Sequence, residues 1–396
     1  KKTSRLKLKR ENSGKIIIKN TQRRLRNWQG KSGAEIINTT AGIEINWTKS
    51  NAGQNLSYFI RGGRNRQVLI LIDGIAVNDP SQIANDYDLR LLNADQIESI
   101  EILKGASSTL YGSGAATAVI NVKLKEASHN EVSANFSSVL GTNQSSTENN
   151  YTIEDFRNSV SVNGRLDKLS YLASFGNQYT NGLSAISGGA ESDAFNSING
   201  NFKLGYHFSK AFKTTVYGSF DNYNADFDDA FSGNDTDDVS TSKQNRVGLS
   251  SELTYQNGSL TINAAYNAIN REIQSSYPTK FNANSYVADV FNRYKFNDAF
   301  YTVIGANVQY NKMESFSIPF GNSDFEQSIN PEEAQFNSVD TYANVVYVTN
   351  YGLQINAGTR LNNHSEYGSQ FVYSINPSFK KETKFGYIKG MASFGT

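Results

Sequence analysis

From Glu131 onward the sequence repeats one pattern, in which apolar and polar residues alternate over segments of about ten residues. The stretch NFKLGYHF, residues 201–208, has an apolar residue at every second position, and residues 260–267 and 353–361 closely follow the same rule. Successive side chains of a strand point to opposite faces of its sheet. We therefore predict about thirteen strands, each with one apolar and one polar face.

The connections between these segments are alternately short and long. Tight turns are predicted at residues 167–168, 209–211, 257–258, 297–298, 351–352 and 381–382. Long polar loops are predicted at residues 178–196, 221–242, 274–283 and 312–337. This alternation is typical of an up-and-down transmembrane barrel with short periplasmic turns and long outward loops, whereas a soluble sandwich mixes loop lengths at both ends. The apolar face is then expected to meet lipid and the polar face to line a wide lumen.

The composition agrees with an all-β membrane protein. The chain has 22 Tyr and 23 Phe but only 5 Pro, and aromatic residues favour strands whereas proline is excluded from their interiors. The longest apolar run, residues 68–72, is far shorter than the roughly 20 residues of a membrane helix. With no cysteine and three widely spaced histidines, the sequence predicts neither a disulfide framework nor a zinc site. A net charge of +1 and a basic N-terminal run without interleaved aromatic residues argue against a nucleic-acid partner.

Residues 1–126 do not follow the alternating pattern. Short elements of mixed type are predicted here, among them a strand at residues 15–19 and a short helix through Ile37 that begins with a capping box of Ser32 and Glu35. We therefore predict a small α+β domain at residues 1–126, followed by the strand array at residues 127–396.

The run GASSTLYGSGAATAVINVKLK, residues 105–125, is unusually rich in small residues. It lacks the order of a phosphate-binding loop, which needs Gly, four residues and then Gly-Lys-Ser/Thr. The nearest imitation, Gly30-Lys31-Ser32, has Leu25 where the first glycine should stand. We interpret the small residues as structural, because they let the backbone pass close to itself and to a surrounding wall.

Several motifs of the first domain, in a single order, resemble the plug of TonB-dependent outer-membrane receptors. They are Ile60-Arg61-Gly62, Leu71-Ile72-Asp73-Gly74, Ile97-Glu98-Ser99-Ile100-Glu101, Gly105 with Ser108, Leu110-Tyr111-Gly112, and Val119-Ile120-Asn121. The sequence departs from the family twice: Lys104-Gly105-Ala106 replaces Arg-Gly-Pro, and Thr117-Ala118 replaces Gly-Gly.

The resemblance implies an α+β plug domain inside an antiparallel transmembrane barrel of about 22 strands, in the outer membrane of a Gram-negative bacterium. The partners it implies are a small-molecule nutrient, TonB of the inner-membrane energising complex, outer-membrane lipid and, as an option, a surface lipoprotein. With about thirteen predicted strands before Thr396, we expect a C-terminally truncated barrel whose edges are open.

Within the family, the predicted wall looks most like that of cobalamin transporters. The likeness rests on strand order and on VYGSFDNYNADFDDAF, residues 216–231, which precedes an acidic loop where cobalamin transporters place calcium ligands. Calcium takes about six to eight oxygen ligands, which clustered carboxylates can supply; a solvated acidic loop is the alternative. The implied metal ligands are Glu191, Asp193, Asp221, Asp229 and Asp238, and no catalytic cofactor or catalytic residue is expected.

Two plug loops, residues 62–67 and 79–87, are expected to face outward beside the long barrel loops. Their amides and one ring suit a large neutral ligand that carries many amides, although ordinary polar loops would have a similar composition. The predicted ligand-binding residues are Arg64, Asn65, Asn78, Gln82, Asn85 and Tyr87.

These features favour an energy-coupled receptor that binds cobalamin or a related corrinoid and imports it to the periplasm. A receptor for ferric siderophores would share both plug and barrel. An outer-membrane protease or lipase needs a Ser or Asp beside a His, and His207 and His364 have no evident partners in the sequence. A passive porin or surface-adhesion barrel would not use about 125 residues to block its own pore.

Overall fold

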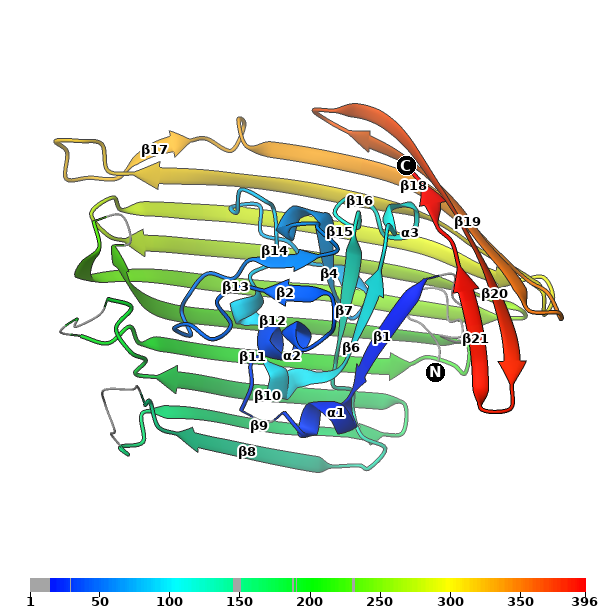
Figure 1. The fold of residues 1–396 in the computed structure, drawn as a ribbon, viewed down its shortest axis with the longest axis horizontal. Coiled ribbons are helices and arrows are strands. Elements are labelled where there is room, and N and C mark those ends of the chain that lie inside the picture. Colours follow the sequence, from blue (N-terminus) through cyan, green and yellow to red (C-terminus); the bar gives the residue numbers. More distant parts are fainter. Residues whose placement is uncertain (1–14, 29, 145–150, 187–188, 190, 230–231) are drawn as a thin grey trace.

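The structure, a computed structural model, describes residues 15–28, 30–144, 151–186, 189, 191–229 and 232–396. The basic run at residues 1–12 lies outside the described residues. The chain forms a small α+β domain, the plug, and a long antiparallel sheet, the wall, that curves around one side of the plug (Figure 1).

The plug is built on a five-stranded sheet with the order β1-β6-β7-β4-β5, in which β4 and β7 are parallel and the other neighbours are antiparallel. A separate hairpin pairs β2 with β3. The core consists mainly of isoleucine, leucine and valine, and Ile37, Ile60 and Ile100 are fully buried. The elements of the plug are β1 (Ile16–Thr21), α1 (Gln22–Arg26), α2 (Gly33–Asn38), β2 (Ile43–Ile45), β3 (Tyr58–Ile60), η2 (Asn65–Gln67), β4 (Val68–Ile72), β5 (Ile75–Ala76), η3 (Leu89–Leu91), η4 (Ala94–Gln96), β6 (Ile97–Lys104), α3 (Ser108–Tyr111) and β7 (Ala118–Leu124).

The predicted capping box is confirmed at the start of α2. The Ser32 hydroxyl accepts from the Glu35 backbone N–H at 3.1 Å, and the Glu35 carboxylate accepts from the Ser32 backbone N–H at 2.8 Å. Two of the unsatisfied amides at the helix start are thereby paired, which allows such a short helix to form.

The wall continues from β8 to β21 along a path of antiparallel neighbours, with β17 paired to β16 and β22 to β20 beside it. The thirteen strands on this path confirm the number expected from the alternating pattern. The strands are β8 (Ser133–Gly141), β9 (Asp155–Leu166), β10 (Leu169–Thr180), β11 (Phe195–His207), β12 (Phe212–Asp229), β13 (Asn234–Tyr255), β14 (Gly258–Gln274), β15 (Thr279–Lys295), β16 (Phe300–Ser317), β17 (Glu326–Ile329), β18 (Gln335–Val348), β19 (Leu353–His364), β20 (Gly368–Thr383), β21 (Gly386–Met391) and β22 (Phe394–Gly395).

The two faces of the wall are inverted relative to a soluble protein. On β11, Phe202 and Leu204 are 45% and 49% exposed, whereas Asn199 and Asn201 are 6% and 8% exposed. The apolar side chains therefore point away from the plug, and the polar ones pack toward it, as expected for a barrel wall in lipid. Among the described residues, no helix is long and apolar enough to cross a membrane.

The connections agree with the predictions at one end of the wall more closely than at the other. Turns lie where expected after β9 and β11, but the predicted turn at residues 381–382 lies inside β20. The predicted long loop at residues 221–242 is also wrong: β12 and β13 pair across most of this range. The loop predicted at residues 274–283 is likewise shortened by β15. Backbone pairing continues into these polar segments because it does not depend on apolar side chains.

Candidate functional site

The two plug loops that the sequence predicted to emerge on one side contact each other. Asn65, in η2, donates from Nδ2 to Asp86 Oδ2 at 2.6 Å, and its Oδ1 accepts from the Tyr58 backbone N–H at 2.8 Å. The loop of residues 62–67 is thereby fixed to the loop of residues 79–87. Since both polar ends of the Asn65 amide are used inside the plug, this residue shapes the surface rather than offering free groups to a ligand.

Asn78 connects the second loop to strands β15 and β16 of the wall. Its Nδ2 donates to Asn85 Oδ1 and to Asn311 Oδ1, both at 2.7 Å, while its Oδ1 accepts from the Ser285 hydroxyl at 2.8 Å. Asn311 is on β16 and Ser285 on β15. A single amide therefore joins the loop to two neighbouring strands, a satisfied polar network of the kind that fixes one arrangement.

A buried carboxylate at the start of the same loop orders its backbone. Asp79 is fully buried, and its Oδ1 accepts from both the backbone N–H and the hydroxyl of Ser81 at 2.9 and 2.5 Å. Arg271 on β14 donates to the Ser81 hydroxyl at 3.0 Å. Burial raises the pKa of Asp79, and the nearby Arg271 charge opposes that shift. The first residues of the loop are therefore fixed to each other and to β14.

The remaining predicted ligand residues differ in exposure. Arg64 is exposed and Gln82 is half-buried, whereas Tyr87 is only 6% exposed and belongs to the plug core. Ile83, at the tip of the same loop, is fully exposed and was not among the predicted residues. Only its position as the one large apolar residue within the stretch SQIAND could have indicated it.

A buried ion pair within the plug contacts the wall. Asp88 Oδ2 accepts from Arg90 at 2.7 Å and from the Tyr223 hydroxyl of β12 at 2.9 Å, and the Arg90 guanidinium also lies 4.5 Å from the centre of the Tyr223 ring. The Asp88 and Arg90 side chains are 3% and 7% exposed. Burial alone would raise the pKa of Asp88, but the Arg90 charge and these hydrogen bonds hold it below its ordinary value.

The small-residue run of the plug docks on three wall strands. Thr109 of α3 lies with its hydroxyl 3.0 Å from that of Ser374 on β20, and Leu110 packs with Tyr342 of β18. Gly112, at the end of α3, has φ of +96°, and a Cβ there would lie 2.8 Å from the buried guanidinium of Arg360. Close approach to the wall therefore requires glycine at this position.

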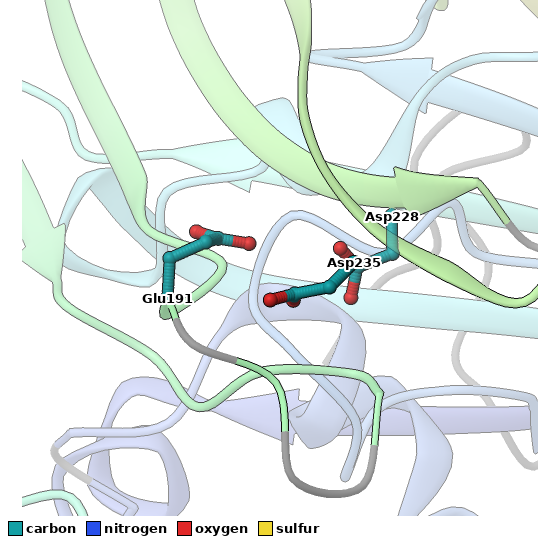
Figure 2. A group of neighbouring side chains, drawn as sticks. All are labelled: Glu191, Asp228 and Asp235. Atoms are coloured by element: carbon teal, nitrogen blue, oxygen red, sulfur yellow. The ribbon is translucent and has the colours of Figure 1, made fainter.

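Three carboxylates gather at the end of the wall where β12 joins β13. Oxygens of Glu191, Asp228 and Asp235 lie within 4.8 Å of one another (Figure 2). Glu191 precedes β11, while the two aspartates flank the turn between β12 and β13. Burial, together with the neighbouring carboxylates of Asp193 and Asp228, raises the pKa of Glu191 to about 6. Such mutual repulsion is relieved when a divalent cation binds.

Unpaired buried oxygens support a cation at this group. Asp228 is 7% exposed, and among the described residues its Oδ2 has no hydrogen-bond partner. The same holds for Glu191 Oε1 and for Oδ1 of Asp193, which is 1% exposed. Buried anionic oxygens without partners are costly, and oxygen is the ligand atom that calcium prefers. The residues present therefore fit a calcium ion.

The five predicted metal ligands are not all placed together. Glu191 is a member of the acidic group and Asp193 is its neighbour, but Asp221 lies seven residues before Asp228, about 20 Å away along the strand. The pairing register shifts by two residues here: Phe227 pairs with Asp238, but Asp229 pairs with Asn234. Asp228 and Asp235 lie in this irregular part of the hairpin, where the regular alternation does not indicate which residues come together. Asp229 and Asp238 lie near each other outside the group.

Comparisons with known proteins find similarity for the plug in sequence and for the plug and wall together in fold. Residues 9–119 match the family model "TonB-dependent Receptor Plug Domain". In fold, the chain is similar to the siderophore receptor PirA of Acinetobacter baumannii, with a TM-score of 0.73 at 16% identity over 97% of this chain. The corresponding values are 0.74, 11% and 96% for the copper transporter OprC. Residues 9–119 thus match the plug family in sequence, and the chain shares its fold with solved outer-membrane receptors and transporters.

Among curated proteins, the chain is similar to the vitamin B12 transporter BtuB of Vibrio vulnificus. The identity to the strain YJ016 protein is 37% over 89 residues, which is 22% of this chain and 14% of the relative. In strain CMCP6 it is 36% over 94 residues, or 24% of this chain and 15% of the relative. The chain spans 61% of the PirA receptor and 63% of OprC.

Proposed function

We propose that this protein is an outer-membrane receptor that binds cobalamin or a related corrinoid at the outer end of its plug and imports it to the periplasm with energy supplied through TonB. The observation that carries the choice of ligand is the 37% identity, over 89 residues, to a vitamin B12 transporter. A ferric siderophore is the competing ligand, because several of the structurally similar receptors are siderophore receptors.

The plug surface supports a large ligand with many amides. Asn65, Asn78 and Asn85 hold the two loops in place, so Arg64, Gln82 and the fully exposed Ile83 are left at the surface. A corrinoid presents side-chain amides around an apolar ring system, and a rigid surface that combines polar groups with one apolar contact suits such a molecule. We infer that these three residues contact the ligand.

Replacing Ile83 with Glu is expected to weaken cyanocobalamin binding by about tenfold or more, because a charge would be desolvated against the apolar part of the ligand. Isothermal titration on the detergent-solubilised receptor measures this effect. Ile16→Glu, on edge strand β1, introduces the same charge at a partly exposed isoleucine outside the two loops and should leave the affinity unchanged. Binding of a ferric siderophore in place of cyanocobalamin by the wild-type receptor would contradict the assignment of a corrinoid.

We also propose that Glu191, Asp228 and Asp235 bind calcium and order the outer loops beside the ligand. The support is the 4.8 Å grouping of their oxygens together with the unpartnered, buried Oδ2 of Asp228. Calcium would offset two of the three negative charges of the group and join Glu191, which precedes β11, to the β12–β13 hairpin. Cobalamin and calcium would then each favour binding of the other.

Asp228→Asn is expected to lower calcium affinity by more than about tenfold, because it removes one charge and one anionic oxygen from the group. Calcium titration of the chelator-treated receptor, followed by calorimetry, provides the measurement. Asp298→Asn, in the turn between β15 and β16 at the other end of the wall, is the matched control and should bind calcium as the wild type does. Equal calcium affinity in both variants would rule out the site.

A further inference from the structure

A plug loop reaches the edge of the acidic group. The loop at residues 46–57 is closed by its own backbone hydrogen bonds, from Asn46 N–H to Ser57 carbonyl at 2.8 Å and from Gln54 N–H to Asn51 carbonyl at 3.0 Å. Asn51 Nδ2 donates to Asp193 Oδ2 at 2.8 Å. Because the loop is locally ordered, the Asn51 amide is held in position rather than extended on a flexible segment.

The same loop is pressed against β12. A Cβ on Gly53 would lie 2.6 Å from Ala225 Cβ. The backbone at Gly53 therefore passes so close to β12 that a larger residue would clash with the strand. Arg90, whose carboxylate partner is bound to Tyr223 of β12, donates to the Gly53 carbonyl at 2.6 Å. The position of Asn51 is therefore set by how the whole plug sits in the wall.

Asp193 is oriented by two donors on one of its oxygens. Besides Asn51, the Ala185 backbone N–H donates to Oδ2 at 2.6 Å. Oδ1 is left without a hydrogen-bond partner among the described residues, in a side chain that is 1% exposed. The Asp193 charge acts on Glu191, two residues along the chain. A carboxylate fixed in this way keeps one oxygen available beside the acidic group.

We propose that Asn51 is a positioning residue that acts through Asp193, so that cation binding at the outer loops is coupled to the seating of the plug. The inference rests on the calcium site proposed above. It adds the contact between Asn51 and Asp193, which links the three clustered carboxylates to a plug loop. Linkage is reciprocal. A receptor whose plug loop is displaced from Asp193 binds the cation less tightly, and a receptor without the cation holds its plug loop less tightly.

The coupling is tested in the intact, detergent-solubilised receptor with calcium as the probe. Asn51→Ala should weaken calcium binding by about tenfold, since Asp193 loses one of the two donors that orient it. Thr109→Val is the matched control, because it removes a different plug–wall contact, to Ser374. This variant should bind calcium like the wild type.

Hydrogen exchange provides a readout that a purely structural role would not change. Calcium should slow amide exchange in residues 46–57 of the wild type and of Thr109→Val but not of Asn51→Ala. Equal calcium affinity and equal calcium-dependent protection in Asn51→Ala would overturn the coupling alone. Absence of calcium binding in the wild type would overturn the cation site together with the coupling, while the corrinoid assignment would still be decided by cobalamin titration in chelator.

Discussion

Arg90→Met is expected to destabilise the plug by about 3–5 kcal/mol, because it leaves the buried Asp88 carboxylate without its cationic partner. Both side chains are almost fully buried, and Arg90 also contacts the Tyr223 ring and the Gly53 carbonyl. The free energy of unfolding can be followed by urea titration with a brief protease pulse, which cleaves the plug once it leaves the wall.

A surface ion pair provides the control for this variant. Lys49 pairs with Glu35 at 3.0 Å, but its side chain is 78% exposed. Lys49→Met should change stability by less than about 1 kcal/mol, as exposed pairs do. A similar small change in Arg90→Met would contradict the view that the buried pair seats the plug.

The pH dependence of this contact follows from the carboxylate. The folded-state pKa of Asp88 is lowered relative to an ordinary aspartate, so its contribution to stability is present above about pH 4 and is lost as the pH falls through the folded-state pKa. The loss should be absent in Asp88→Asn.

Gly112→Ala is expected to destabilise the plug by about 3 kcal/mol or more. Its φ of +96° and ψ of −168° lie in a region that glycine alone adopts readily, and this alone costs about 1–3 kcal/mol. In addition, the new Cβ would lie 2.8 Å from the Arg360 guanidinium, which is buried and bonded to Asp340 through Nε at 3.1 Å. The same urea and protease measurement applies.

Gly62→Ala separates the two causes. Gly62 also has positive φ, +79°, but a Cβ there would meet nothing within 4 Å. Its cost should be limited to backbone strain. If Gly112→Ala were no more destabilising than Gly62→Ala, the contact between the small-residue run and Arg360 would not stabilise the docked plug.

The sequence predicts the wall better than the details of its outer end. Alternation over about ten residues has one structural interpretation at each segment, and all thirteen strands of the main path are present. The β12–β13 hairpin was predicted as a loop because its residues are polar, yet backbone pairing carries it well beyond the apolar part of the strands. Periodicity identifies the face of a strand but not the length of its polar extension.

The candidate sites depend on contacts that no local pattern encodes. Asp228 lies in the acidic group at the point where the pairing of β12 with β13 becomes irregular, and the alternating pattern does not predict this irregularity. Asn51 and Asp193 meet across 142 residues of sequence. The plug loops were located correctly because strand–turn signals flank them, but only the folded chain distinguishes Asn65 and Asn78, which hold the loops, from Ile83, which is exposed.

Uptake of labelled cyanocobalamin tests the central claim most directly. The receptor is produced in the outer membrane of a Gram-negative host that has TonB but no cobalamin receptor of its own, and cell-associated label is measured with and without the inner-membrane proton gradient. We predict accumulation that requires the receptor and the gradient and that decreases in Ile83→Glu. Accumulation of a labelled ferric siderophore, with no receptor-dependent uptake of cyanocobalamin, would contradict the proposed function.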